Sequence, residues 1–284
     1  MKKLKMVIPK GRMFDNVARL LSDAGLRFRM NNRLYVPWFE DNEIEGKIMK
    51  PQSIPKLIEL GSHDVGFTGF DWIQETDSDV SEVLDLKLDP VRIMAAVPYG
   101  SSRSHIRSRK IVVASEYERI ARNFLDREKY DYVLIRSYGA TEAFPPQDAD
   151  MIIDNSATGR TLKEHDLKVV ASIMESSTRF IANPRVHQTG WKKEKIEELR
   201  MLFVSVLNAR ERVMLEMNVP GEKLEELVRV LPCMRSPTVQ RLYGEQGYAV
   251  KVAVKKKEAF RLIPLVKKMG ATDILEYEFR KVIS

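Results

Sequence analysis

The sequence predicts an α/β protein made of two lobes with a cleft between them, followed by a smaller ferredoxin-like domain. Three observations support this fold class. Short apolar strands alternate with helical segments in the first half of the chain, as in mostly parallel sheets covered by helices. Two strand-rich stretches interrupt the alternation and are interpreted as crossings between the lobes. The last part of the chain has the order β-α-β-β-α-β.

The first lobe is predicted from hydrophobic periodicity and from glycine and proline at the ends of helices. Its expected strands are 4–8, 47–50 and 64–72, and its expected helices are 14–21 and 51–61. Gly25 and Gly61 lie where the two helices should end, and Pro51 lies where the second begins. The strand over 64–72 breaks into a glycine-bearing turn.

The second lobe is predicted between two strand-rich crossings, 83–98 and 167–184. Between them we expect strands at 110–114, 132–135 and 150–154 and a helix over 115–126. Ser115 is the residue type expected at the N-cap of that helix. A long polar helix over 190–212 leads out of this part of the chain.

The C-terminal segment has its own alternation of strands and helices. The expected strands are 213–219, 236–244, 248–255 and 273–283, and the expected helices are 221–231 and 257–270. The predicted domains are therefore lobe I at 1–92 with 179–211, lobe II at 93–178, and a ferredoxin-like domain at 212–284.

The composition indicates a soluble globular protein, with 44% hydrophobic and 31% charged residues. No apolar stretch approaches the ~20 residues that span a bilayer, and the N-terminus lacks a secretory apolar run. A single cysteine, Cys233, cannot form an internal disulfide, so we expect a reducing, cytoplasmic location. The net charge of +7 is spread along the chain, which favours phosphate-bearing ligands over a nucleic acid or membrane partner.

The stretch MIIDNSATGRTL, 151–162, is the most informative local pattern. An apolar strand ends in Asp154, and a turn rich in hydroxyls and containing glycine leads into a helix. Backbone N–H groups at such a turn can bind a phosphate, and the carboxylate can accept from ribose hydroxyls or approach hydrated Mg²⁺. The alternative is a helix start that Asp, Ser and Thr merely cap. The stretch is neither a Walker A loop nor a GxGxxG motif.

Motifs in the same order along the chain resemble the long form of the ATP phosphoribosyltransferase family, which has a C-terminal regulatory domain. The matching segments are IPKGR (8–12), PQSIPKLIELGSHDVGFTGFDWI (51–73), YGATE (138–142), DNSATGRTL (154–162), SPTV (236–239) and the pair Gly270-Ala271. The commonest phosphoribosyltransferases have two adjacent acids before the loop, whereas Asn155 follows Asp154 here. The resemblance covers essentially the whole chain.

The resemblance implies transfer of phosphoribose from 5-phosphoribosyl 1-diphosphate to N1 of ATP, releasing pyrophosphate, as the first step of histidine biosynthesis. The substrate supplies its own nucleophile, so catalysis rests on positioning and electrostatics. Mg²⁺ is the implied cofactor. Histidine, and AMP as a further candidate, are the implied inhibitors, and a homo-oligomer between dimer and hexamer is implied.

The resemblance also implies the site residues. The phosphoribosyl diphosphate loop comprises Asp154, Asn155, Ser156, Ala157, Thr158, Gly159, Arg160, Thr161 and Leu162. The ATP-binding candidates are Lys10, Gly11, Arg12, Lys50 and Asp71. The catalytic candidates are Lys10, Glu142 and Asp154, of which Glu142 and Asp154 are also the metal candidates.

Each of these residues has a structural alternative. The basic residues could be solvated surface charges, Asp71 could cap the helix that follows it, and Glu142 could be a first-turn helix acid. In the C-terminal domain the resemblance implies a histidine site at Ser236, Thr238 and Ala271, while SPTV could equally be an ordinary strand start.

Two rival functions follow from the same pattern. Two periplasmic-binding-protein-like lobes with a cleft also describe non-catalytic small-molecule sensors, although we find no leader peptide or DNA-binding segment in the sequence. A short-form-like subunit that needs a separate regulatory partner is a third possibility, against which the ferredoxin-like segment argues.

Overall fold

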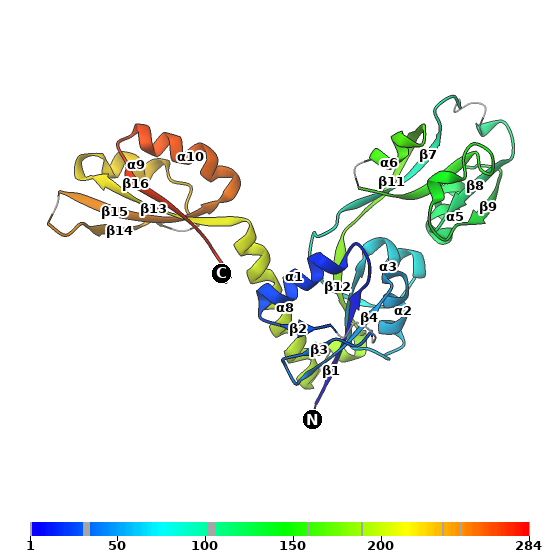
Figure 1. Ribbon diagram of the computed structural model, residues 1–284, viewed down its shortest axis with the longest axis horizontal. Coiled ribbons are helices and arrows are strands. Elements are labelled where there is room, and N and C mark those ends of the chain that lie inside the picture. Colours follow the sequence, from blue (N-terminus) through cyan, green and yellow to red (C-terminus); the bar gives the residue numbers. More distant parts are fainter. Residues whose placement is uncertain are drawn as a thin grey trace. The chain divides into compact units, whose positions relative to one another are not determined.

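A computed structural model describes residues 2–30, 35–101, 106–157, 159–188, 190–234, 236–244 and 246–283. The chain forms two compact units, Met1–Ser22 with Leu26–Glu197, and Asp23–Gly25 with Glu198–Ser284. Figure 1 shows their elements, coloured along the chain from blue at the N-terminus to red at the C-terminus. No helix in the described ranges is long and apolar enough to cross a membrane.

The first sheet of the larger unit has the strand order β4-β1-β5-β12-β6. Its strands are β1 (Leu4–Pro9), β4 (Ile44–Met49), β5 (Val65–Gly69), β6 (Ser81–Asp85) and β12 (Thr178–Ala182). β1 is parallel to β4 and β5, so the carboxyl ends of these three strands lie at one edge of the sheet. The associated helices are α1 (Phe14–Ala24), η1 (Pro51–Ser53), α2 (Ile54–Glu59) and α3 (Phe70–Thr76), and β2 (Phe28–Arg29) pairs with β3 (Trp38–Phe39).

The second sheet of the larger unit has the order β11-β7-β10-β8-β9. Its strands are β7 (Val91–Pro98), β8 (Ile111–Ser115), β9 (Tyr132–Arg136), β10 (Met151–Ser156) and β11 (Leu167–Ser176). β8 is parallel to both β9 and β10, which again brings strand ends together at one edge. The helical segments are α5 (Glu118–Arg127), η2 (Thr141–Ala143) and α6 (Arg160–Glu164).

The chain passes between the two sheets twice. It leaves the first sheet after Asp85 and joins the second at Val91, and it returns between Ser176 and Thr178. In each sheet one of these crossing strands runs antiparallel to its neighbours: β12 lies between β5 and β6, and β7 lies between β11 and β10. The larger unit therefore consists of two mixed α/β lobes joined by two crossings, as predicted.

The smaller unit contains an antiparallel sheet of order β14-β15-β13-β16. Its elements are β13 (Arg212–Pro220), η3 (Gly221–Lys223), α9 (Leu224–Val230), β14 (Thr238–Arg241), β15 (Gly247–Lys255), α10 (Lys256–Lys268) and β16 (Thr272–Glu278). Alternate residues of β13 and β15 pack with the helices in one apolar core. This is the predicted βαββαβ domain, and the fold class is confirmed.

Several predicted boundaries differ from the structure, and the strand pairing explains most of the differences. The segment predicted as a strand over 273–283 ends at Glu278, which pairs with Val213 near the start of the antiparallel strand β13. Within the segment predicted as a strand over 236–244, only the four residues from Thr238 to Arg241 pair with β15. The helix over 51–61 is a 3₁₀ turn followed by a short α-helix.

Ser115 is not the N-cap that the sequence indicated. It is the last residue of β8, and its hydroxyl donates to the Ile153 carbonyl at 2.6 Å. The helix begins at Glu118, after Tyr117 at the N-cap. The Ser115 hydroxyl, which the local sequence predicted to cap the helix, instead donates a hydrogen bond to the neighbouring strand.

An ion pair connects the start of α8 (Gly190–Arg210) to the first sheet. The short helix α7 (Pro184–Gln188) precedes α8 in the chain. The carboxylate of Asp64, just before β5, is buried and accepts from Lys192 Nζ at 2.7 and 2.8 Å. The same carboxylate accepts from the backbone N–H of Lys5 in β1, at 2.8 Å. Removing the lysine would leave the carboxylate buried with fewer partners.

We expect Lys192→Ala to lower the free energy of unfolding by about 2 kcal/mol, because a buried acceptor loses its charged donor. The neighbouring, solvent-exposed Lys193 provides the matched control, and Lys193→Ala should change stability by less than about 0.5 kcal/mol. Urea denaturation followed by circular dichroism measures both. Equal stability of the two variants would show that the ion pair contributes nothing.

Candidate active site

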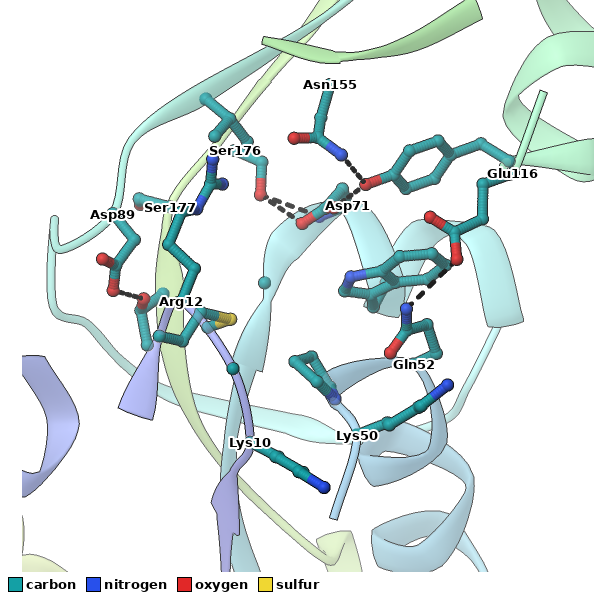
Figure 2. A pocket seen from close by; sticks show the side chains of 18 residues that line it. Lys10, Arg12, Lys50, Gln52, Asp71, Asp89, Glu116, Asn155, Ser176 and Ser177 are labelled. Carbon is teal, nitrogen blue, oxygen red and sulfur yellow. Dashed lines mark hydrogen bonds between the residues drawn. The ribbon is translucent and has the colours of Figure 1, made fainter. Parts of the chain in front are cut away.

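The two lobes of the larger unit enclose a cavity of ≈ 510 Å³ that both of them line (Figure 2). Lys10, Lys50 and Asp71 reach it from the carboxyl ends of β1, β4 and β5, which share one edge of the first sheet. Glu116 and Asn155 reach it from the ends of β8 and β10, which are neighbours in the second sheet. Ligands of α/β folds bind at such edges, since loops and strand ends converge there.

A second cavity of ≈ 260 Å³ lies against the loop that follows β10. Its lining includes Glu142, Asp154 and Thr161 together with Arg12 from the first lobe. Arg12 and Asn155 line both cavities, so the two spaces adjoin. The sequence-predicted candidates for ATP and for phosphoribosyl diphosphate are thereby brought next to each other.

The basic residues of the first lobe form one wall of this region. The backbone N–H of Lys10 donates to the Met49 carbonyl at 2.7 Å, which joins the ends of β1 and β4. Lys10 Nζ donates to the Tyr35 hydroxyl at 3.1 Å and lies 4.9 Å from that ring's centre. Gly11 has a φ of +83°, a conformation that glycine adopts without strain. The side chains of Lys10, Arg12 and Lys50 are largely exposed and available to an anionic ligand.

Asp71 is buried in the wall between the lobes and does not cap α3 with its side chain. Ser176 Oγ donates to Asp71 Oδ1 at 2.6 Å, and the Tyr117 hydroxyl donates to Oδ2 at 2.7 Å. A side chain at Gly69 would overlap with Asp71 Oδ1, so this position requires glycine. Both oxygens of the carboxylate are thus engaged by the protein.

Asp154 is the most perturbed carboxylate of the site. Its pKa is raised to about 6, with burial as the largest cause. Hydrogen bonds from Thr141 and the Asn155 backbone lower the pKa, and the nearby Glu116 and Glu142 raise it. Asn155 N–H donates to Asp154 Oδ1 at 2.7 Å. A cation near this group of carboxylates would relieve their mutual repulsion.

The loop after Asp154 contains a hydrogen bond between two of its own residues. Ser156 Oγ accepts from the Gly159 N–H at 2.9 Å, and Gly159 has a φ of +73° with no neighbour near its missing Cβ. Gly159 occupies the N-cap of α6 and has no side chain, so the N-cap residue itself provides no side-chain cap for this helix. Arg160 pairs with Glu164 at 2.7 Å, and Leu162 is buried in the core of the second lobe. Thr158 lies outside the described residues.

The metal candidates are few. Across the described ranges, no group of three or more His, Cys, Asp or Glu side chains is arranged to hold a metal ion. Glu142, in η2, and Asp154 line the same cavity. This donor set fits Mg²⁺, which is commonly held by one or two carboxylates together with substrate phosphates.

The three residues predicted for the regulatory site are not brought together within one chain. Ser236 and Thr238 are exposed at the edge strand β14. Ala271 is buried just before β16, the opposite edge of the sheet. Two strands separate them, which corresponds to roughly 14 Å at the usual strand spacing.

Sequence reasoning missed Tyr117, Glu116 and Ser176. Gln52 Nε2 also donates across the cleft to Glu116 Oε1 at 3.2 Å. A usable signal existed for Glu116 and Tyr117, because they closely follow the strand predicted over 110–114, which the structure places beside β10. Ser176 had no such signal, since its role depends on a hydrogen bond to a residue 105 positions away.

Comparison with known proteins gives matches over nearly the whole chain. The family model described as HisG: ATP phosphoribosyltransferase matches residues 50–204, and that of the HisG C-terminal domain matches 209–281. An ATP phosphoribosyltransferase of Chlorobium phaeobacteroides is 38% identical over 286 residues, covering 99% of this chain and 97% of that protein. One from Thermodesulfovibrio yellowstonii is 37% identical over 290 residues, covering 99% of each.

A solved structure, described as the ATP phosphoribosyl transferase (HisG:HisZ) complex from Thermotoga maritima, superposes with a TM-score of 0.63. Its sequence is 26% identical, and the match covers 71% of this chain and 98% of that chain.

We expect Asp154→Asn to stabilise the protein above pH 6. The folded pKa of about 6 exceeds the ordinary 3.8, so the folded state holds the proton more tightly and loses stability as the pH rises between these values. At pH 8 the variant should be more stable by about 1–3 kcal/mol, and the difference should vanish near pH 4. Urea denaturation at both pH values measures it.

The control for this measurement is Asp131→Asn, a change at an exposed carboxylate of the same lobe. It should alter stability by less than about 0.5 kcal/mol at either pH. A destabilised Asp154→Asn at pH 8 would mean that the hydrogen bonds to the carboxylate outweigh its burial.

Proposed function

The chain belongs to the ATP phosphoribosyltransferase family, the enzymes of the first step of histidine biosynthesis, and on this premise we propose how its cleft holds the substrates. Full-length identity of 37–38% to ATP phosphoribosyltransferases carries the assignment. The family assignment excludes a purely non-catalytic sensor. The match to the HisG C-terminal domain also excludes a chain without a regulatory segment.

Phosphoribosyl diphosphate occupies the cavity beside the loop 154–162 in this proposal. Backbone N–H groups of Ala157 and Arg160 and the hydroxyls of Ser156, Thr158 and Thr161 hold the 5-phosphate, while the Gly159 N–H donates within the loop to Ser156 Oγ. Asp154 accepts from the ribose hydroxyls, with Asn155 beside it. Leu162 anchors the loop in the core of the lobe. The open space around Gly159 supports this placement, because a phosphate can approach the backbone there.

ATP occupies the larger cavity. Lys10, Arg12 and Lys50 neutralise its phosphates, and Gly11 lets the backbone approach them. Asp71 forms the floor of this cavity with its oxygens engaged by the protein. Because Arg12 lines both cavities, it lies between the triphosphate and the diphosphate.

Glu142 and Asp154, which line the same cavity, would hold Mg²⁺ beside bound phosphoribosyl diphosphate. When bound, this ion supplies positive charge to the departing pyrophosphate. The protein residues align N1 of the adenine with the anomeric carbon, and Lys10 stabilises charge that develops on the leaving group. The raised pKa of Asp154 supports a cation here, because burial, together with Glu116 and Glu142, disfavours the ionised form that a cation would stabilise.

The C-terminal domain makes the enzyme sensitive to histidine, with AMP as a further inhibitor. Ser236, Thr238 and Ala271 contribute to the histidine site. We assign lobe I to 1–92 with 179–211, lobe II to 93–178 and the regulatory domain to 212–284. The enzyme assembles as a homo-oligomer between dimer and hexamer and works in the cytoplasm, and neither a nucleic acid nor a membrane is a partner.

Activity is tested by mixing the protein with ATP, phosphoribosyl diphosphate and Mg²⁺ and following phosphoribosyl-ATP by its absorbance. We expect Asp154→Ala and Thr161→Ala to lower kcat/KM for phosphoribosyl diphosphate about ten- to hundredfold, because each removes a polar contact to a charged substrate. Lys163→Ala, at an exposed position on the same short helix, is the control. No product from the unmodified chain under any condition would refute the assignment.

Histidine should inhibit this activity. Ser236→Ala and Thr238→Ala should raise the histidine concentration for half inhibition about tenfold through loss of a polar contact, each compared with its own uninhibited rate. Glu225→Gln, on the exposed side of α9, is the control and should leave that concentration unchanged. Inhibition that is equally strong in all three variants would remove these hydroxyls from the histidine site.

A further inference from the structure

A chain of hydrogen bonds runs from the first lobe to the carboxylate of the phosphoribosyl loop. It begins at the buried Asp71, whose Oδ2 accepts from the Tyr117 hydroxyl at 2.7 Å. Asn155 Nδ2 donates to the same hydroxyl oxygen at 3.0 Å (Figure 2). Asn155 Nδ2 also lies 3.2 Å from Asp154 Oδ1, and the Asn155 N–H donates to that oxygen at 2.7 Å.

The directions of these bonds follow from counting hydrogens. A phenol has one hydrogen, and a carboxylate can only accept, so Tyr117 gives its hydrogen to Asp71. Burial and the adjacent Asp71 carboxylate raise the pKa of Tyr117 well above its usual range, which keeps that hydrogen in place. The Tyr117 oxygen therefore presents only lone pairs to the next residue, and position 155 must supply a donor.

An asparagine meets this requirement and an aspartate does not. The amide of Asn155 can donate to Tyr117 and to Asp154 at once, whereas a carboxylate would face a lone pair on one side and a second carboxylate on the other. The same requirement accounts for Asn155 at the position where the commonest phosphoribosyltransferases carry a second acid. The one-acid loop is matched to Tyr117 of its own lobe, which in turn donates to Asp71 of the first lobe.

The ring of Tyr117 is held independently of its hydroxyl. It stacks on Trp72 of the first lobe, with ring centres 4.5 Å apart and an angle of 24°. The backbone N–H groups of Arg119 and Ile120 donate to Glu75 at 3.1 and 3.0 Å. Removing only the hydroxyl therefore leaves the contact between α3 and α5 in place.

We propose that Tyr117 and Asn155 are positioning residues for the transfer reaction, through which Asp71 in the first lobe sets the orientation of the Asp154 carboxylate toward phosphoribosyl diphosphate. The inference rests on the proposed placement of that substrate at the loop 154–162. Asp71, Tyr117 and Asn155 also line the larger cavity that we assign to ATP. Both Asp71 oxygens and the hydrogen of the Tyr117 hydroxyl are already engaged by the protein, so we expect the main effect at the Asp154 carboxylate, where the chain of hydrogen bonds ends.

The first test is Tyr117→Phe, which removes the hydroxyl and keeps the stacked ring. We expect the KM for phosphoribosyl diphosphate to rise about tenfold and the KM for ATP to change less than twofold, since Asp154 loses its fixed orientation. Tyr132→Phe is the matched control, because it removes another tyrosine–aspartate hydrogen bond, of 2.8 Å to Asp126, on an exposed surface of the second lobe. It should alter neither constant.

The second test is a double-mutant cycle with Asn155→Leu, a substitution of similar size without polar atoms. If Tyr117 acts through the Asn155 amide, the double variant should be no more impaired than the worse single variant. Asn155→Asp should be at least as impaired as Asn155→Leu, because it adds a charge beside Asp154. Should Tyr117→Phe fail to fold, the comparison of Asn155→Leu with Asn155→Asp still tests whether position 155 must supply a hydrogen-bond donor.

Equal changes in the two KM values, or additive effects of the two substitutions, would overturn the proposal and leave Tyr117 a purely structural residue. Calorimetric binding of phosphoribosyl diphosphate with Mg²⁺ gives a readout that does not need turnover, and Tyr117→Phe should weaken it about tenfold. Turnover by the unmodified chain tests the proposed function separately. Substrate binding without turnover would refute that function and still allow the positioning proposal to be judged.

Discussion

The buried carboxylate of Asp71 joins the two walls of the cleft. A carboxylate away from water is tolerated only when hydrogen bonds satisfy its oxygens, and here Ser176 and Tyr117 donate one bond each. These two donors come from the crossing and from the second lobe, while the acceptor follows a strand of the first. Moving the two walls apart at this point would break hydrogen bonds to a buried carboxylate, which costs free energy. Gly69 leaves the space that Asp71 needs.

The charges of the cleft are divided between the lobes. The first lobe contributes the exposed amines and guanidinium of Lys10, Lys50 and Arg12, and the second contributes the carboxylates of Asp154, Glu142 and Glu116. Such a division suits the substrates and cation that we propose, because phosphates would face the basic wall and the cation would offset the acidic one. Burial is the main reason that the pKa of Asp154 is raised, Glu116 and Glu142 add to it, and a cation at the acidic wall would favour the ionised form.

The regulatory domain is built on a separate core. Its sheet places β14 and β16 at opposite edges, so the two halves of the predicted histidine site do not meet in one chain. A ligand that touched both halves would need a second copy to bring them together, which is consistent with the oligomer we propose. Communication with the catalytic lobes would then depend on assembly as well as on the chain itself.

The sequence by itself determined the architecture and the loop. Apolar periodicity and the positions of glycine and proline were sufficient for two α/β lobes and a βαββαβ domain, because these patterns reflect local geometry and one-sided burial. They also located Lys10, Lys50 and Asp154, since residues at the carboxyl ends of parallel strands converge on one edge of a sheet. Only the tertiary structure decided that Ser115 bonds across strands rather than capping a helix, that Asp71 is shared between lobes, and that position 155 must donate. Those outcomes depend on hydrogen bonds between residues far apart in the chain, and no local pattern records which partner a hydroxyl or carboxylate will find.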